Sequence, residues 1–309
     1  MAALTFSCSP KLAPQGQTDA RPEPVTLLLY PEGQAVDKGL AGGPLESNGL
    51  TGPETFRKDG FRYNVTDSAS VTLYIPEVCN GQMVVVCPGG GYYGVAMVYE
   101  GYRVAEWMNA RGIAACVVKY RMPNGHDRIP LQDVQNAFRY CRAHAAEWGV
   151  TKIGVMGFSA GGHLAATASN LFADKTTRPD FSILIYPVIT MDPAVSHGGT
   201  RKNLLGAENF SEGDPRLDRL EDRYSMEKQV TVSTPPTFIA LGADDKTVPP
   251  ENSLRYFESL HAAGVPAELH IYPEGPHGFS FRRSDEHDPI AYCRPDFDAA
   301  LTRWLEGLR

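Results

Sequence analysis

The chain has 309 residues, of which 42% are hydrophobic and 21% are charged, and its net charge at pH 7 is −7. This composition is that of a globular protein with enough residues for one large α/β domain or two small ones. Because the charge is negative and the lysines and arginines are scattered, nucleic acid and anionic membrane surfaces are disfavoured as main partners, and a neutral substrate is favoured.

The cysteines and histidines predict neither a disulfide framework nor a bound metal. The chain has six cysteines, but it contains no C-x-x-C pair and no H-E-x-x-H stretch. The densest cluster of possible ligands is Asp285-Glu286-His287-Asp288, where we expect a solvated loop. We therefore predict no metal and no cofactor.

Residues 1–24 form a proline-rich segment that we expect to be flexible and to precede one domain at 25–309. The segment contains no membrane-spanning stretch. Leu4–Cys8 resembles the remainder of a trimmed export or lipoprotein signal, which would predict a periplasmic or secreted location. The N-terminus of a cytoplasmic protein is the alternative, and both remain open at this point.

From Val25 onward, apolar runs alternate with segments of helical periodicity. The runs from Met83 onward are short and largely apolar, which is typical of strands buried on both faces of a parallel sheet. The alternation predicts a doubly wound α/β fold, with a mostly parallel central sheet, helices on both faces and right-handed crossovers. The expected strands are Val25–Tyr30, Phe61–Val65, Val71–Ile75, Met83–Cys87, Ile113–Tyr120, Lys152–Met156, Phe181–Tyr186, Thr237–Leu241 and Ala267–Tyr272. The expected helices are Tyr102–Arg111, Leu131–Glu147, Ala160–Phe172, Glu251–Ala263 and Asp296–Leu308.

One long stretch, residues 188–236, interrupts this alternation. It contains glycines, prolines and many charged residues, and no convincing strand. We expect it to be a cap insertion over the carboxyl edge of the sheet.

A glycine-rich stretch, Cys87-Pro88-Gly89-Gly90-Gly91-Tyr92, follows the strand Met83–Cys87. Glycine allows a close backbone approach and positive φ, so such a loop can aim amides at an anion. The stretch lacks the G-x-G-x-x-G spacing of a dinucleotide-binding turn, and the next helix is delayed.

The stretch Gly157-Phe158-Ser159-Ala160-Gly161 stands between an expected strand and an expected helix. A serine flanked by glycines at this junction is typical of a nucleophile elbow, in which a tight turn exposes Oγ at the carboxyl edge of the sheet. We expect the amides of Ala160, Gly90 and Gly91 to form the oxyanion hole, with Gly89 as an alternative donor.

A serine nucleophile needs a base and an orienting acid, which in this topology follow it in the order Asp, His. His277 follows the last expected strand directly, in a loop rich in glycine and proline. Asp245 is the expected acid, and its neighbour Asp244 is the alternative. Among the other histidines, we expect His163 to form a structural hydrogen bond behind the elbow, and His197 lies in a loop outside the triad order.

Aromatic and charged residues surround these motifs. We expect Tyr92 and Tyr93, which follow the glycine loop, to stack on a sugar ring or on an aromatic acyl group. We also expect an ion pair between Glu100 and Arg121.

Taken together, these motifs resemble the α/β-hydrolase esterases of the acetylxylan esterase and feruloyl esterase type from polysaccharide-utilisation systems of gut Bacteroidetes. The resemblance covers nearly the whole chain from Leu27 on. The matching stretches are Leu29–Gly33, Val86–Tyr92, Glu100–Tyr102, Lys119–Pro123, Ile153–Leu164, Arg178–Phe181, Arg201–Gly206, Asp244–Pro249 and Pro276–Phe279.

The resemblance implies release of acetyl groups, and in some members of ferulate, from xylan or related plant polysaccharides, with Ser159, Asp245 and His277 as the catalytic triad. An acylated polysaccharide or oligosaccharide is then the partner. Two departures, Pro276 and Phe279-Ser280-Phe281, lie beside the acyl site and leave the acyl preference open. The alternatives are a peptidase of the prolyl-oligopeptidase type, a carboxylesterase for small esters, and a non-catalytic glycan-binding protein.

Overall fold

The computed structural model describes residues 23–30, 53–66, 69–211, 213–279, 281 and 294–308. Several sequence predictions lie outside these residues. They concern nearly all of the proline-rich segment 1–24 with Leu4–Cys8, the motif residues 31–33, the loop 285–288 and Ser280.

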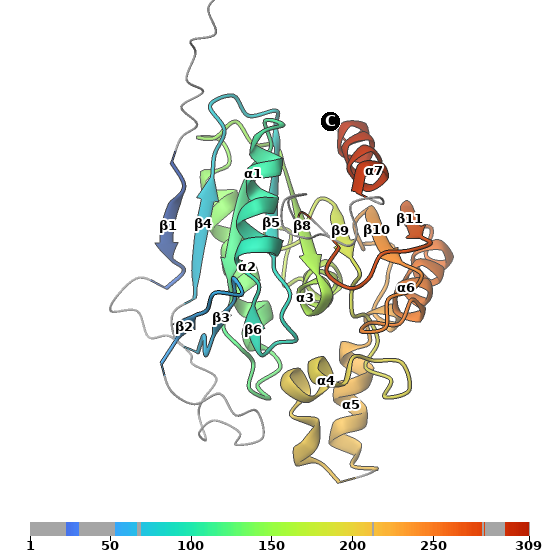
Figure 1. The fold of residues 1–309 in the computed structure, drawn as a ribbon. Helices are drawn as coiled ribbons and strands as arrows, with labels where there is room; N and C mark the ends of the chain where they lie inside the picture. The colour runs from blue at the N-terminus through green and yellow to red at the C-terminus, as the bar shows by residue number, and fades with distance from the viewer. Residues whose placement is uncertain are drawn as a thin grey trace, which may run out of the picture.

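An eight-stranded sheet forms the centre of the molecule, in the order β1-β4-β7-β5-β8-β9-β10-β11 (Figure 1). β4 pairs antiparallel with β1 and with β7, and every other neighbouring pair is parallel. The strands are β1 (Val25–Leu28), β4 (Ser70–Tyr74), β5 (Gln82–Cys87), β7 (Ala114–Lys119), β8 (Lys152–Phe158), β9 (Ser182–Ile185), β10 (Thr237–Gly242) and β11 (Ala267–Tyr272).

The strand predicted at Phe61–Val65 is shorter than expected and belongs to a second sheet. This small antiparallel sheet joins β2 (Thr55–Phe56), β3 (Arg62–Tyr63) and β6 (Gly94–Val95). Because β6 follows the glycine loop directly, the small sheet anchors the outer end of that loop.

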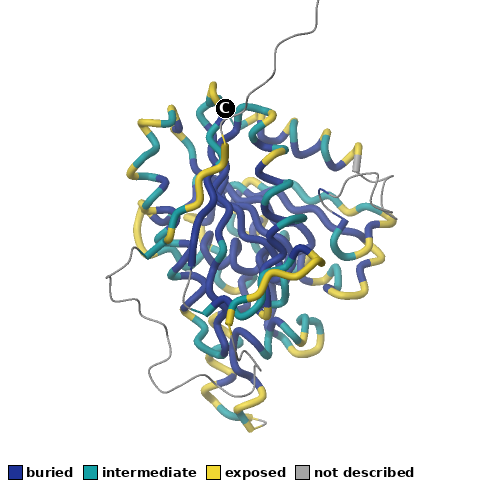
Figure 2. The backbone as a smooth tube through the Cα atoms, turned by 60° about the vertical axis from the view of Figure 1, so that its left-hand side comes forward, coloured by how far each residue is buried: buried dark blue, intermediate teal, exposed yellow. Residues whose placement is uncertain are grey.

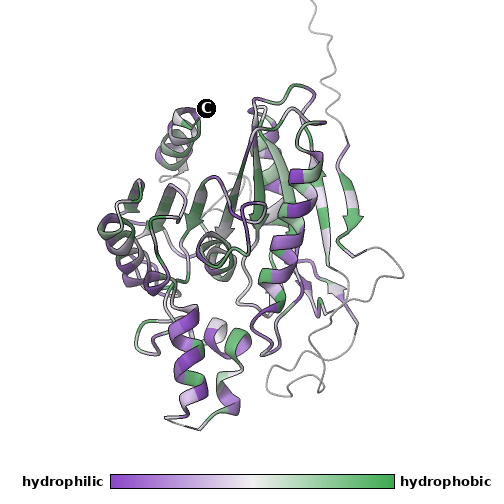
Figure 3. Ribbon diagram, turned by 180° about the vertical axis from the view of Figure 1, so that it is seen from behind, coloured by the Kyte–Doolittle hydropathy of each residue, from purple (hydrophilic) through white to green (hydrophobic). Residues whose placement is uncertain are grey.

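Helices cover both faces of the large sheet. Helices α1 and α7 lie on one face, and α2, α3 and α6 lie on the other (Figures 1 and 3). β5 is buried along its whole length, as is β8 beyond its first residue, so the strands stand out as the buried core in Figure 2. The helices are α1 (Arg103–Asn109), which continues a π-helical turn at Val98–Tyr102, α2 (Ile129–His144), α3 (Ser159–Asn170), α6 (Glu251–Ala262) and α7 (Arg294–Gly307).

Four helical pieces occupy residues 188–236, and no strand occurs in the described part of this stretch. They lie beyond the end of the sheet at which β8 runs into α3 (Figure 1). Asp214 begins one of them, α5, by accepting a hydrogen bond from the amide of Arg216, with proline at the first helical position. The pieces are α4 (Gly198–Leu205), η3 (Ala207–Asn209), α5 (Pro215–Tyr224) and η4 (Met226–Lys228).

A buried ion pair ties β7 to α2. Nη2 of Arg121 lies 2.7 Å from Oδ1 of Asp133, and both side chains are fully buried. The hydroxyl of Tyr30 donates to the same carboxylate at 2.6 Å. Among the described residues Arg121 pairs with Asp133, whereas Glu100 accepts the amide of Gly89 and the hydroxyl of Tyr186, which corrects the pairing expected from the sequence.

Candidate active site

Ser159 lies at a tight turn between β8 and α3. Its φ of 53° is in the left-handed region, which is strained for a residue with a side chain. A Cβ at Gly157 would lie 2.1 Å from the carbonyl oxygen of Gly161, and a Cβ at Gly161 would lie 2.2 Å from that of Cys87. Only glycine fits at both positions, so the flanking glycines allow the turn that carries the serine.

Ser159, His277 and Asp245 form one hydrogen-bonded chain. Nε2 of His277 lies 2.8 Å from Oγ of Ser159, and its Nδ1 lies 2.7 Å from Oδ2 of Asp245. The other carboxylate oxygen, Oδ1, accepts the amides of Thr247 and Val248 at 2.8 and 3.0 Å. Since Asp245 is buried and its loop holds the carboxylate in place, the carboxylate fixes the orientation of the imidazole.

Asp244 takes a different position from Asp245. Its side chain is exposed and accepts the amide of Gly275 at 2.7 Å. Gly242 and Gly275 lie so close that a Cβ on Gly242 would be 1.9 Å from the carbonyl oxygen of Gly275. Asp244 therefore holds the loop that carries His277, and of the two neighbours only Asp245 contacts the imidazole.

The glycine loop faces the elbow with two unusual backbone conformations, φ 132° at Gly90 and φ 64° at Gly91. The amide of Gly89 already donates to Oε2 of Glu100 at 2.7 Å, so Gly89 is not available as an oxyanion donor. Within the described part of the chain, the amides of Gly90, Gly91 and Ala160 have no acceptor. These three amides can therefore serve an anion.

The structure contradicts the prediction that Tyr92 contacts the substrate. Its side chain is 1% exposed, and its hydroxyl lies 3.0 Å from Nδ1 of His163. The positive φ of 57° at Tyr92 accompanies this inward direction. Tyr93 is 42% exposed, with its ring 5.7 Å from that of Tyr63, and it remains a predicted substrate contact.

His163 lies behind the elbow in the hydrogen-bonding role expected for it. Its Nε2 lies 2.8 Å from the carbonyl oxygen of Tyr224, to which it donates, so Nδ1 accepts from the hydroxyl of Tyr92. Burial lowers the pKa of His163 to about 4. The ring is therefore neutral near pH 7 and connects α3 to the last residue of α5.

His197 is a residue that the sequence reasoning placed outside the site. It is the N-cap residue of α4, and a Cβ at Gly91 would lie 3.7 Å from its Cε1. Burial lowers its pKa, and the charge of His277 lowers it further. The structure thus brings a second histidine to the glycine loop.

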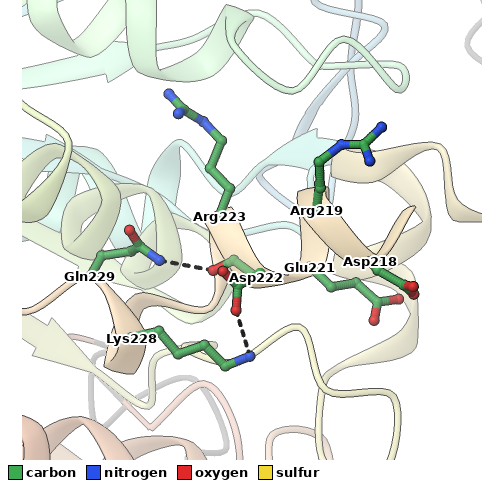
Figure 4. A pocket seen from close by; sticks show the side chains of 7 residues that line it. All are labelled: Asp218, Arg219, Glu221, Asp222, Arg223, Lys228 and Gln229. Atoms are coloured by element: carbon green, nitrogen blue, oxygen red, sulfur yellow. Dashed lines mark hydrogen bonds and ion pairs between the residues drawn. The ribbon is translucent and has the colours of Figure 1, made fainter. Parts of the chain in front are cut away.

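A surface cleft of about 850 Å³ lies on the outer part of the 188–236 segment, and none of its lining residues belongs to the triad or to the glycine loop. Figure 4 shows its charged lining, in which Lys228 pairs with Asp222 at 2.9 Å. The lining residues are Asp218, Arg219, Glu221, Asp222, Arg223, Lys228 and Gln229.

Across the described ranges, no group of three or more His, Cys, Asp or Glu residues could hold a metal ion. None of the helices in those ranges has the length and apolar character needed to cross a membrane.

Comparison with known proteins places these features in a family. Residues 84–281 match the family model described as alpha/beta hydrolase fold. The acetylxylan esterase of Xylanibacter ruminicola is 41% identical over 72% of this chain and 46% of its own length. For endo-1,4-beta-xylanase B of Butyrivibrio fibrisolvens, the identity is 34% over 64% of this chain and 32% of that protein. The chain thus spans less than half of these two relatives.

A solved structure gives the same result. The acetyl ester-xyloside bifunctional hydrolase of Caldicellulosiruptor lactoaceticus is 34% identical, with a TM-score of 0.68 over 78% of this chain and 88% of that one. The predicted fold and the resemblance to acetylxylan esterases are confirmed: the chain belongs to the alpha/beta hydrolase fold family.

Proposed function

We propose that this chain is a serine carboxylesterase that removes acetyl groups from xylan or related plant polysaccharides through an acyl-enzyme. The observation that carries the proposal is the unbroken chain from Ser159 through His277 to Asp245, with contacts of 2.8 and 2.7 Å. The names of the two relatives, an acetylxylan esterase and a xylanase, and of the acetyl ester-xyloside hydrolase support this substrate class.

In the first half of the reaction, Oγ of Ser159 attacks the ester carbonyl while Nε2 of His277 accepts the hydroxyl proton. The carboxylate of Asp245 stabilises the imidazolium that forms and keeps Nδ1 protonated. The amides of Gly90, Gly91 and Ala160 donate to the oxyanion of the tetrahedral intermediate. Such donors stabilise the transition state because they are already oriented before charge develops.

In the second half, the imidazolium of His277 gives its proton to the departing sugar alkoxide. Water then enters, His277 takes a proton from it, and the resulting hydroxide attacks the acyl-serine. Collapse of the second tetrahedral intermediate releases the acid and restores Ser159. No step needs a metal ligand or a cofactor group from this chain.

The acyl group is the finer part of the proposal. We propose acetyl as the main acyl group, and feruloyl as a second group that remains to be tested. Tyr93 is the exposed ring of the glycine loop and can stack on a sugar or on an aromatic acyl group. Because a polysaccharide does not cross a bilayer, this function favours a periplasmic or secreted location, which fractionation of producing cells tests.

The deciding experiment measures acetate released from acetylated xylan, by the protein and by its Ser159→Ala variant, with methyl ferulate and p-nitrophenyl acetate alongside. We expect acetate from xylan with the protein and none with the variant. Turnover of p-nitrophenyl acetate alone would keep the serine mechanism and refute the xylan assignment. Cleavage of peptide substrates would favour the prolyl-oligopeptidase alternative, and a serine that an active-site phosphonate fails to label would favour the non-catalytic one.

A further inference from the structure

A histidine from α4 lies beside the proposed oxyanion loop. His197 precedes the first turn of α4. A Cβ built on Gly91 would lie 3.7 Å from Cε1 of His197. From the same helix, Nδ2 of Asn203 donates to the carbonyl oxygen of Gly91 at 2.8 Å. α4 therefore contacts the loop that we assign to the oxyanion through Asn203 and places His197 beside it.

The hydrogen bonds of His197 determine which ring nitrogen can serve a ligand. Nδ1 accepts the amide of Thr200 at 3.2 Å and lies 2.9 Å from the hydroxyl of the same residue. An amide only donates, so Nδ1 is unprotonated and the proton of the neutral ring is on Nε2. In the described ranges, Nε2 has no partner, and the half-buried ring leaves it able to donate to a ligand.

The charge state of the ring agrees with a neutral donor. Burial lowers the pKa of His197, the positive charge of His277 lowers it further, and Asp245 acts in the opposite direction. The ring thus lies within electrostatic range of two triad members and stays neutral near pH 7, which avoids repulsion when His277 becomes an imidazolium.

The segment before His197 is held by the helix that follows the acid loop. Nδ2 of Asn252, in α6, donates to the carbonyl oxygen of Val195 at 3.0 Å, and Arg255 pairs with Asp192 at 3.0 Å. The position of His197 is therefore set by contacts on both sides, from α6 and from the cap of α4.

We propose that Nε2–H of His197 donates a hydrogen bond to the hydroxyl that neighbours the acylated carbon of the sugar. The inference rests on the proposed esterase function. His277 protonates the departing alkoxide and Gly91 donates to the oxyanion, so a donor near both lies on the alcohol side of the ester. An alcohol with a free neighbouring hydroxyl, as in a partly acetylated sugar, is then selected over a simple alkyl or aryl alcohol.

The first test combines a protein change with a substrate change. His197→Asn keeps a side chain that caps helices well but is too short to replace Nε2. The substrates are a mono-acetylated methyl xyloside and its analogue with the neighbouring hydroxyl replaced by hydrogen. We expect His197→Asn to lower kcat/KM for the xyloside about 10-fold more than for the deoxy analogue, since the hydrogen bond exists only with the first. Equal losses on both substrates would overturn the proposal.

A second test moves the ring without replacing it. A Cβ at Gly199 would lie 3.0 Å from Cε1 of His197, whereas a Cβ at Gly198 meets nothing within 4 Å apart from its two chain neighbours. Both glycines are in the first turn of α4, so Gly198→Ala is a matched control. We expect Gly199→Ala to lower the preference for the xyloside over the deoxy analogue about 3-fold, and Gly198→Ala to leave it unchanged. The same preference in both variants would contradict the placement of the donor.

A binding measurement separates this inference from the proposed function. Calorimetry with Ser159→Ala and the mono-acetylated xyloside measures affinity without turnover. We expect the added His197→Asn change to weaken binding about 5-fold, and an unchanged Kd would refute the contact. If the unaltered protein hydrolyses the xyloside no faster than Ser159→Ala does, the esterase function is refuted, whatever the binding result.

Discussion

The two halves of the candidate active site are held in place by different means. The nucleophile half consists of β5, β8, α3 and the loop 88–92, and the histidine half consists of β10, β11 and the loops that follow them. β5 and β8 are buried almost throughout, whereas β11 is half-buried or exposed along its length. In the nucleophile half, backbone atoms pack where a Cβ would be, so Ser159 is positioned by the main chain.

The histidine half has one such backbone contact, between Gly242 and Gly275, and adds side-chain hydrogen bonds that hold its catalytic residues. Asp245 holds the imidazole and is itself held by two amides, and Asp244 holds the loop of His277 through Gly275. The comparison teaches that the same kind of substitution should act differently in the two halves. Replacing a hydrogen-bonding side chain of the histidine half should lower kcat. Replacing a glycine beside Ser159 should lower the free energy of unfolding.

The largest effect expected is that of Ser159→Ala, which should lower kcat for p-nitrophenyl acetate by about 10⁶-fold. The nucleophile is lost, while the turn and its glycines are unchanged, so the thermal unfolding midpoint should stay within a few degrees. Steady-state kinetics and circular dichroism measure both. Activity above one hundredth of the unaltered protein would show that another nucleophile acts.

Next in size is Asp245→Asn, which should lower kcat by about 10⁴-fold because the amide no longer stabilises the imidazolium or its tautomer. Asp244→Asn is the matched control, since it alters the adjacent carboxylate, which accepts the amide of Gly275 and does not bond the imidazole within the described residues. We expect less than a 10-fold loss for the control. Full activity of Asp245→Asn would move the acid to Asp244.

A backbone change in the nucleophile half should act on stability. Gly161→Ala places a Cβ 2.2 Å from the carbonyl oxygen of Cys87 and 2.4 Å from that of Pro88, which forces α3 away from the glycine loop. We expect a loss of about 4 kcal/mol in the free energy of unfolding, measured in urea. Gly307→Ala, whose Cβ meets nothing within 4 Å, is the control. Equal stability of the two variants would contradict the tight main-chain packing around Ser159.

His163 should make stability depend on pH. Its pKa is about 4 in the folded protein, against an ordinary value of 6.5, so the unfolded chain binds the proton first as the pH falls. The contribution of His163 to the free energy of unfolding is up to about 3 kcal/mol. It is complete above pH 6.5 and is lost as the pH falls toward 4. Urea unfolding at pH 7 and at about pH 4.5 should show a smaller difference for His163→Gln. If that variant loses as much stability between pH 7 and pH 4.5 as the unaltered protein, the loss comes from groups other than His163.

The smallest effect concerns the edge of the site. Tyr93→Ala should raise KM for acetylated xylo-oligosaccharides about 3-fold with little change in kcat, because an exposed ring contributes stacking alone. A lower kcat with the same KM would show that Tyr93 acts on the loop rather than on the sugar.

The central strands and the order of the motifs could be predicted because their signals are local. β5, β8 and β10 are short apolar runs, and the loops after β8, β10 and β11 bring Ser159, Asp245 and His277 to one edge of the sheet. Parallel strands place such loops together, so the order along the chain predicted His277 and the acid loop, and the position of Asp245 within that loop favoured it over Asp244.

The predictions that failed depend on contacts between distant segments. Nothing near Tyr92 in the chain shows that its φ is positive and that its hydroxyl meets His163, 71 residues later. Arg121 pairs with Asp133 because the start of α2 lies against the end of β7. His197 approaches Gly91 through the packing of α4, whose eight residues carry little periodicity.

The chain order of the strands also has a consequence during protein synthesis. Ser159 precedes its base by 118 residues, and β10 and β11 are the last strands in the chain and lie at one edge of the sheet. A nascent chain that has emerged only through β9 contains the elbow and the glycine loop but no group to deprotonate the serine. Under the proposed mechanism, hydrolysis requires His277, which follows β11, so Ser159 of an incomplete chain on the ribosome lacks its base.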